Sequence, residues 1–194
     1  MKQNLLAAAC AALMFTACGG DKSTKKPNAP AQKMEKAAPS ADETAIADAI
    51  HGFFTWYNDN VDRIGDIGFA IEKGKHMTLD EKKLQEYVGE LKKSGFVSDE
   101  LGVDETKYYQ ACAKIWATES LDQPSTGLAL DRYRCAFDYV APYDKAPVTA
   151  TITGDRAKAV LALSPQDLHN FELKKENGKW LLSKPSCAET NVKY

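Results

Sequence analysis

The sequence has few of the residues and none of the spacings that mark common catalytic or metal-binding proteins. Its 194 residues include three histidines and five cysteines, without a C-x-x-C, H-E-x-x-H or H-x-H spacing. Their absence argues against a thiol redox enzyme, a structural zinc site and a histidine-based metal centre. There is also no G-x-S-x-G nucleophile elbow, P-loop or glycine-rich phosphate cradle. We therefore expect no metal and no cofactor.

Basic residues are not in excess, and no apolar run is long enough to span a bilayer. From Ala41 onward the chain has 19 Lys and Arg against 25 Asp and Glu. A nucleic-acid-binding protein needs a basic face, so this balance argues against nucleic acid as a partner. The apolar stretch Leu5–Phe15 is too short for a membrane-spanning helix. The apolar fraction of 44% and the length predict one globular domain with appendages.

Residues 1–17 have the pattern of a secretory signal peptide, with Lys2 ahead of the short apolar core. The sequence Phe15-Thr16-Ala17-Cys18 resembles the lipobox of bacterial lipoproteins. The resemblance implies cleavage before Cys18 and acylation of its thiol and its new amine. Several acyl chains would hold the protein stably to the lipid bilayer of an inner or outer membrane, with the domain in the periplasm or at the cell surface. A plain signal peptide cut near Ala17 is the alternative.

Residues 18–39 are expected to be a flexible tether. They are rich in Gly, Ser, Pro, Ala and Lys, and Met34 is their one large apolar residue. Such a segment cannot bury enough surface to fold. We expect residues 40–187 to form the folded domain and residues 188–194 to form a C-terminal tail.

The folded domain is predicted to begin with an amphipathic helix over Ala41–Asn58. Ser40 and Glu43 have the spacing of a capping box, which begins a helix. The apolar residues that follow at helical spacing are Ile46, Ile50, Phe53, Tyr57 and Val61. A face this apolar must be covered, and we expect a C-terminal sheet to cover it.

Further helices are predicted before residue 121. Residues 58–77 contain three glycines and are interpreted as an irregular helix or a long loop. A second capping box at Thr78–Glu81 begins a helix that Gly95 ends. Ser98 is expected to cap a short turn through Leu101, and Asp104 is expected to cap a separate helix.

The second half of the domain changes to the two-residue period of strands. Alternation predicts a strand or bent edge over residues 131–139, and alternation with β-branched residues predicts strands over residues 148–153, 157–163, 171–174 and 179–183. Asn177-Gly178 predicts a type I′ hairpin between the last two. Helices followed by antiparallel strands predict an α+β fold.

Three segments together resemble DUF3828, a family of bacterial proteins that includes many lipoproteins. They are Phe53–Tyr57 in the first helix, Phe96–Leu101 before a later helix, and Asp131–Tyr139 followed by paired strands and Asn177–Trp180. The resemblance implies an NTF2-like (cystatin-like) fold, in which a curved sheet wraps round helices and encloses a cone-shaped cavity. It also implies that a homodimer through the sheet is an option. It implies no particular activity.

Three cysteines remain in the folded domain, and export permits a disulfide. Cys112 with Cys135 is the favoured pair, which leaves Cys187 unpaired. The alternative is that all three are buried thiols that pack as small apolar groups.

The candidate cavity residues are Asp131, Asp138, Tyr57 and Trp56. Asp138 with Tyr57 or Tyr139 could act as an acid–base pair whose pKa values are tuned by burial, as in some NTF2-like enzymes. The alternative is that Asp131 caps a turn and Asp138 accepts backbone hydrogen bonds. A wider set of aromatic residues could line a ligand pocket, with packing in the core as the favoured alternative: Trp56, Tyr57, Tyr108, Tyr109, Trp116 and Trp180.

The sequence therefore predicts a non-enzymatic binding module, tethered to the cell envelope, for a small molecule or a protein. One alternative is an isomerase or hydratase that uses Asp138. Another is a protein-interaction or immunity-type lipoprotein.

Overall fold

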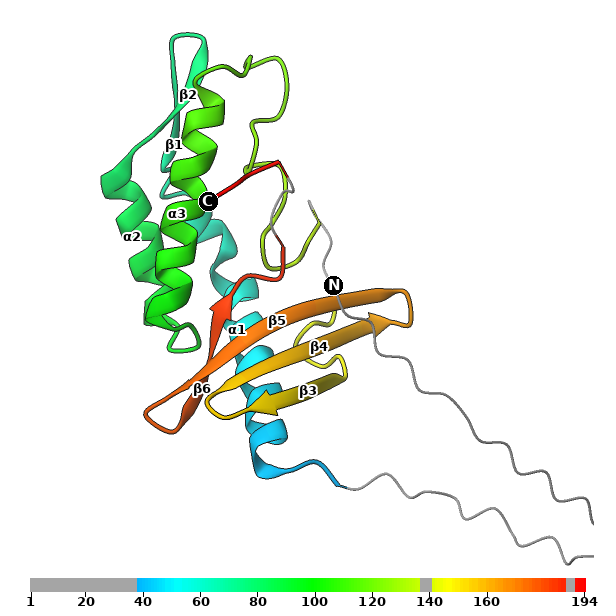
Figure 1. The fold of residues 1–194 in the computed structure, drawn as a ribbon. Coiled ribbons are helices and arrows are strands. Elements are labelled where there is room, and N and C mark those ends of the chain that lie inside the picture. Colours follow the sequence, from blue (N-terminus) through cyan, green and yellow to red (C-terminus); the bar gives the residue numbers. More distant parts are fainter. Residues whose placement is uncertain (1–37, 137–140, 188–190) are drawn as a thin grey trace, which may run out of the picture. The chain divides into compact units, whose positions relative to one another are not determined.

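In the computed structural model, which describes residues 38–136, 141–187 and 191–194, helices precede a four-stranded antiparallel sheet. Figure 1 shows this α+β architecture, as the sequence predicted. The elements are α1 (Ala41–Gly65), β1 (Ala70–Lys73), β2 (His76–Leu79), α2 (Glu81–Lys93), α3 (Asp99–Trp116), β3 (Val148–Thr153), β4 (Arg156–Ser164), β5 (Asp167–Glu176) and β6 (Lys179–Lys184). Cys10 and Cys18, the signal peptide and nearly all of the predicted tether lie outside the described residues.

Helix α1 begins where the capping box predicted. The Ser40 hydroxyl accepts a hydrogen bond from the Glu43 amide at 3.2 Å, and the Ser40 amide donates to the Glu43 carboxylate at 2.7 Å. The helix continues to Gly65, because Val61 and Ile64 extend its apolar face. The prediction of an irregular helix or loop over residues 58–77 was therefore wrong. The rest of that stretch includes the hairpin β1–β2, which turns at Gly74 with a φ of +69°.

Helix α2 starts at the cap Asp80 and is followed by Gly95 in the left-handed region (φ +72°), which agrees with the predicted end. Ser98 does cap a helix, but that helix runs without a break from Asp99 to Trp116. The prediction of a second start at Asp104 was wrong. Its carboxylate pairs with Arg132 instead of capping backbone amides.

The main sheet has the order β3-β4-β5-β6, with neighbouring strands antiparallel. Asn177 and Gly178 both have positive φ values (51° and 80°), as a type I′ hairpin requires. The four predicted C-terminal strands form, and β5 is longer than predicted at both ends. The strand predicted over residues 131–139 was wrong for its described part, because residues 131–136 form turns.

Helix α1 packs on the main sheet, which confirms the expected cover for its apolar face (Figure 1). Phe53 and Phe54 are fully buried. The Phe54 ring stacks on Tyr143 with centroids 4.6 Å apart and meets the edge of Phe171 from β5 at 5.7 Å. Burial of a side chain of this size contributes about 2–3 kcal/mol. Helix α3 packs against β2 and β6, so it joins the small hairpin to the sheet.

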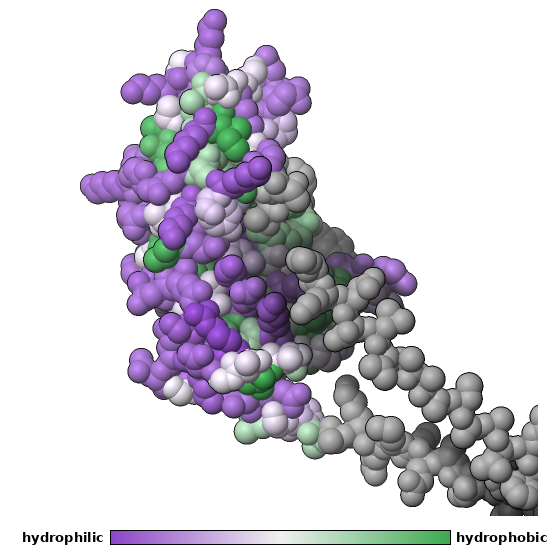
Figure 2. Space-filling view, viewed as in Figure 1, coloured by the Kyte–Doolittle hydropathy of each residue, from purple (hydrophilic) through white to green (hydrophobic). Residues whose placement is uncertain are grey.

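The surface seen in Figure 2 is largely hydrophilic, and its hydrophobic residues are separated from one another. Single exposed apolar side chains of this kind are normal on folded proteins. In the described ranges, no helix combines the length and apolar character needed to cross a membrane.

Candidate functional site

A cavity of about 390 Å³ lies among the three helices and the loop of residues 127–133. Its lining comes from the second half of α1, the turn before β1, Tyr87 of α2, Tyr109 of α3 and this loop. No lining residue belongs to β3–β6. The cavity therefore differs from the sheet-enclosed one implied by the family resemblance. Its volume is within the range of small-molecule sites.

Aromatic rings form much of the cavity wall. The centroid of Phe69 lies 5.1 Å from that of Tyr87 and 4.5 Å from that of Tyr109. The rings of Tyr87 and Tyr109 meet edge to face at 6.2 Å. Tyr87 and Tyr109 lie on the buried faces of α2 and α3, so two packed helices hold both rings in place. Planar walls of this kind suit a flat ligand.

The predicted cavity residues Tyr57 and Asp131 meet at this site. The Tyr57 hydroxyl donates to Asp131 Oδ2 at 3.1 Å. Asp131 Oδ1 accepts from the backbone amides of Tyr133 and Arg134 at 2.8 and 2.9 Å. The alternative that Asp131 caps a turn is therefore confirmed. Three donors engage this carboxylate, and it positions the loop rather than offering a vacant base.

The outcome differs for the other two predicted cavity residues, Trp56 and Asp138. Trp56 lies outside the cavity lining and packs against Phe53, with centroids 6.3 Å apart. Asp138 and Tyr139 lie outside the described residues, so the acid–base pair with Tyr57 stays a prediction.

An ion-pair network that the sequence did not reveal adjoins the cavity through Arg132, which is one of its lining residues. Arg132 Nη2 lies 3.0 Å from Asp104, and Arg132 Nη1 lies 3.1 Å from Glu105. The Arg132 guanidinium also lies 3.7 Å from the ring centroid of Tyr108. Glu105 accepts a hydrogen bond from the Tyr133 hydroxyl at 2.8 Å. The network ties the loop to α3.

One sequence signal could have identified this network. Glu105 occurs at helical spacing with Leu101, Tyr108 and Cys112, so it is a charge within the apolar stripe of α3. Buried charges are almost always paired, so the stripe required a cationic partner. Only the fold decides that this partner is Arg132.

Residues 191–194 belong to the same network. The Tyr194 hydroxyl donates to Asp104 and accepts from Arg132, both at 3.2 Å. Val192 is buried. The end of the chain therefore packs on α3, and the described part of the predicted tail extends the domain.

Four buried tyrosines around the cavity stay protonated at neutral pH. Burial, together with nearby acidic groups, raises the pKa of Tyr57, Tyr87, Tyr109 and Tyr133 well above the ordinary tyrosine value. The ring centroids of Tyr57 and Tyr133 lie 5.1 Å apart and those of Tyr87 and Tyr109 lie 6.2 Å apart, and all four residues line the same cavity. Burial also raises the pKa of Glu105, against the opposing effect of Arg132. The site is therefore a cluster of phenol donors beside a buried carboxyl group.

Two of these hydroxyls lack a partner. Those of Tyr57 and Tyr133 donate to Asp131 and Glu105, whereas those of Tyr87 and Tyr109 form no hydrogen bond with any described residue. The side chains of Tyr87 and Tyr109 are each only 7% exposed. Neither hydroxyl is among the fully enclosed polar atoms without a partner, so each keeps some accessible surface, and both tyrosines line the cavity.

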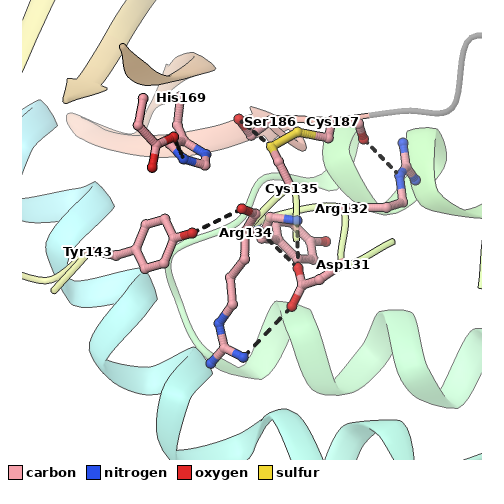
Figure 3. The surroundings of a disulfide bond; sticks show 10 residues. Asp131, Arg132, Arg134, Cys135, Tyr143, His169, Ser186 and Cys187 are labelled. Carbon is pink, nitrogen blue, oxygen red and sulfur yellow. Dashed lines mark hydrogen bonds and ion pairs between the residues drawn. A yellow bond between two sulfur atoms is a disulfide. The ribbon is translucent and has the colours of Figure 1, made fainter. Parts of the chain in front are cut away.

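A disulfide between Cys135 and Cys187 holds the loop that carries Asp131 (Figure 3). The Cα atoms are 5.7 Å apart. Beside it the Cys187 amide donates to the Arg132 carbonyl at 2.9 Å. Figure 3 shows Arg134 reaching toward Asp131, while Arg132 extends toward the Cys187 carbonyl. The disulfide therefore connects the cavity loop to the segment after β6.

The predicted pairing of Cys112 with Cys135 was wrong. Cys112 is fully buried on α3 and keeps its thiol. It faces residue 127, where an added Cβ would lie 2.5 Å from the sulfur. Cys135 lies in a turn with a φ of 57°, next to Ser186, and so meets Cys187. The pairing depends on the position of the segment after β6, which spacing along the chain does not reveal.

The three histidines make hydrogen bonds within the domain. His51 contacts the Ala146 carbonyl at 2.9 Å, His76 the Glu119 carbonyl at 2.8 Å, and His169 the Asp167 carboxylate at 3.0 Å. Within residues 38–136, 141–187 and 191–194, no group of three or more His, Cys, Asp or Glu side chains could hold a metal ion.

No protein-family model, curated protein or solved structure matches this chain. The geometry of the site must therefore carry the functional argument.

Proposed function

We propose that this protein is a lipoprotein of the bacterial cell envelope, anchored through Cys18, whose folded domain binds a small molecule in the tyrosine-lined cavity. One observation supports the proposal that the domain binds a small molecule. Two phenol hydroxyls on side chains more than nine-tenths buried border a cavity of about 390 Å³ and have no partner among the described residues. A largely buried hydroxyl without a protein partner is a donor that an acceptor atom of a bound molecule could engage.

The anchor rests on the sequence Phe15-Thr16-Ala17-Cys18 and on the tether-like residues after it. The expected result is that the mature protein begins at an acylated Cys18 and fractionates with membranes. A Cys18→Ser variant should lose the acyl mass and leave the membrane fraction. A mature N-terminus at another residue would contradict the anchor but not the cavity.

The NTF2-like assignment is part of the same proposal. It is supported by the order of helices before an antiparallel sheet and by the packing of α1 on that sheet. The position of the cavity away from the sheet is a departure from the expected arrangement. An experimental structure in which the sheet does not curve round α1 would contradict this assignment.

A non-enzymatic role fits the state of Asp131, whose carboxylate is engaged by two backbone amides and Tyr57. A general base needs an accessible lone pair directed at the substrate. If Asp138 were instead a catalytic base, an Asp138→Asn variant would lose turnover of some substrate while still binding it.

Native mass spectrometry of the full chain, purified gently from its own cells, tests the binding function. We expect an added mass of small-molecule size that is lost on denaturation. The matched control is a Tyr87→Phe, Tyr109→Phe double variant, which should retain less of that mass. A second polypeptide in place of a small molecule would favour the protein-interaction alternative, and a bare chain would contradict the proposal.

A further inference from the structure

Resting on the proposed binding function, we infer the chemical class of the ligand. The geometry points to an uncharged, flat molecule that offers a carbonyl-type oxygen as a hydrogen-bond acceptor to the hydroxyls of Tyr87 and Tyr109. The inference combines three properties of the cavity: its unused donors, the charges around it and the shape of its wall.

The unused donors define the polar end of the ligand. Tyr87 and Tyr109 line the cavity and their accessible hydroxyls have no acceptor among the described residues, whereas Tyr57 and Tyr133 donate to carboxylates. Both unused phenols are protonated at neutral pH, as an ordinary tyrosine is, and burial raises their pKa further. A protonated phenol beside open space is a ready donor, so an acceptor atom is the complement that the site lacks.

The nearby negative charge disfavours an anion. Glu105 is fully buried, and its carboxyl group contributes to the raised pKa of both Tyr87 and Tyr109. Arg132, the cation nearest to Tyr109, is already paired with both Glu105 and Asp104, so it offers no free positive charge to a carboxylate or phosphate of a ligand. The unused hydroxyls therefore do not make an anion site.

The positions of the arginines disfavour a cation. Aromatic rings near carboxylates could in principle hold an ammonium group through their faces. Here the guanidinium of Arg134 lies 5.2 Å from the centroid of Tyr57, and that of Arg132 lies 3.7 Å from Tyr108 and 5.9 Å from Tyr109. The chain's own cations already use these rings and would repel another positive charge.

The wall defines the apolar part of the ligand. Phe69, Tyr87 and Tyr109 surround one side of the cavity with planar rings whose centroids lie 4.5–6.2 Å apart. Val61 and Ile64 add apolar surface from α1. A flat ring system against these residues, with its acceptor toward the phenols, would satisfy the hydroxyls and bury apolar area together.

Four probe molecules of similar shape test the acceptor and the charge of the ligand separately. Acetophenone has the carbonyl acceptor, α-methylstyrene replaces that oxygen with a methylene group, benzoate is an anion and phenyltrimethylammonium is a cation. Each is titrated into the full chain in the same mild detergent, and binding is followed by ligand-observed NMR. Carbonyl-¹³C acetophenone adds a specific readout, because its carbonyl resonance moves downfield when the oxygen accepts a hydrogen bond.

The expected result is that acetophenone binds about tenfold or more tightly than the other three probes, with a saturable downfield shift, the preference reflecting its two hydrogen bonds. The Tyr87→Phe, Tyr109→Phe variant should abolish that preference and that shift while its binding of α-methylstyrene is unchanged. Circular dichroism and thermal melting confirm that the variant is folded.

Other outcomes would overturn the inferred ligand class, and they can be told apart from a failure of the proposed binding function. Equal affinity for acetophenone and α-methylstyrene would overturn the acceptor, and tightest binding of benzoate or phenyltrimethylammonium would overturn the charge argument. In each case the cavity would still bind a small molecule. Failure of all four probes would overturn the inference, and only a bare chain in native mass spectrometry would also overturn the binding function.

Discussion

Arg132 and Glu105 form an ion pair in the interior of the domain, with Nη1 and Oε2 3.1 Å apart and side chains 2% and 0% exposed. Glu105 lies in α3, whereas Arg132 lies in the cavity loop of residues 127–133, which follows α3 in the sequence. Because Glu105 also holds the Tyr133 hydroxyl, the pair joins the helix to the cavity wall. Burial opposes the charge of Arg132, but Glu105 and the surrounding phenols outweigh this effect and raise its pKa.

Loss of one partner from this pair should be strongly destabilising. We expect Arg132→Met to lower the free energy of unfolding by about 3–5 kcal/mol, because it leaves a buried carboxylate without its cation. Urea denaturation measures the change. The exposed pair Arg156–Glu100 is the control, and Arg156→Met should cost less than about 1 kcal/mol. Equal effects at the two sites would contradict the importance given to burial.

The two unused hydroxyls should behave differently from the bonded ones when removed. Without ligand, we expect Tyr87→Phe and Tyr109→Phe to leave stability unchanged or raise it by up to about 1 kcal/mol, since no hydrogen bond is lost. Tyr133→Phe should lower stability by about 1–3 kcal/mol, since Glu105 loses a donor while buried. Thermal melting of the three variants is the measurement. A large loss for Tyr87→Phe would mean that its hydroxyl already has a structural partner.

The buried tyrosines should make the domain sensitive to alkaline pH. Burial raises the pKa of Tyr57, Tyr87, Tyr109 and Tyr133 in the folded state. Above about pH 10 the unfolded chain releases protons that the folded chain retains, so stability is complete below that pH and falls as pH rises toward the folded values. Each tyrosine with a raised pKa lowers the free energy of unfolding by about 1.4 kcal/mol per pH unit between its unfolded-state and folded-state pKa values.

Phenolate absorbance and urea denaturation between pH 8 and 11 test this prediction together. Most of the buried tyrosines should ionise only as the protein unfolds, and the Tyr87→Phe, Tyr109→Phe variant should show a shallower loss of stability. Ionisation of all tyrosines near pH 10 in the folded protein would show that the cluster is open to solvent.

The disulfide should support both stability and the cavity. Reduction, or a Cys135→Ser, Cys187→Ser double variant, should lower the free energy of unfolding by about 2–4 kcal/mol, because it releases a loop closed over 52 residues. Amide exchange at residues 131–136 should increase, and acetophenone binding should weaken. Peptide mapping of the oxidised protein checks the pairing itself, and a bridge that includes Cys112 would contradict the structure.

The sequence by itself determined the features of this domain that depend on interactions between residues close together in the chain. Ser40 and Glu43 begin α1 through contacts three residues apart, and Asn177-Gly178 makes its hairpin because both residues accept positive φ. The alternation of Val148–Thr153 predicted its strand because the side-chain period is a local property. The order of these elements was enough for the α+β class.

Only the tertiary structure decided the contacts that make the site. Asp131 lies in a turn rather than a strand, and its hydroxyl donor is Tyr57, which is 74 residues away. Cys135 pairs with Cys187 because the segment after β6 returns to the cavity loop. Glu105 is tolerated in an apolar stripe because Arg132 arrives beside it. Such pairings depend on how distant elements pack, and local patterns carry no information about which distant residue fills a given place.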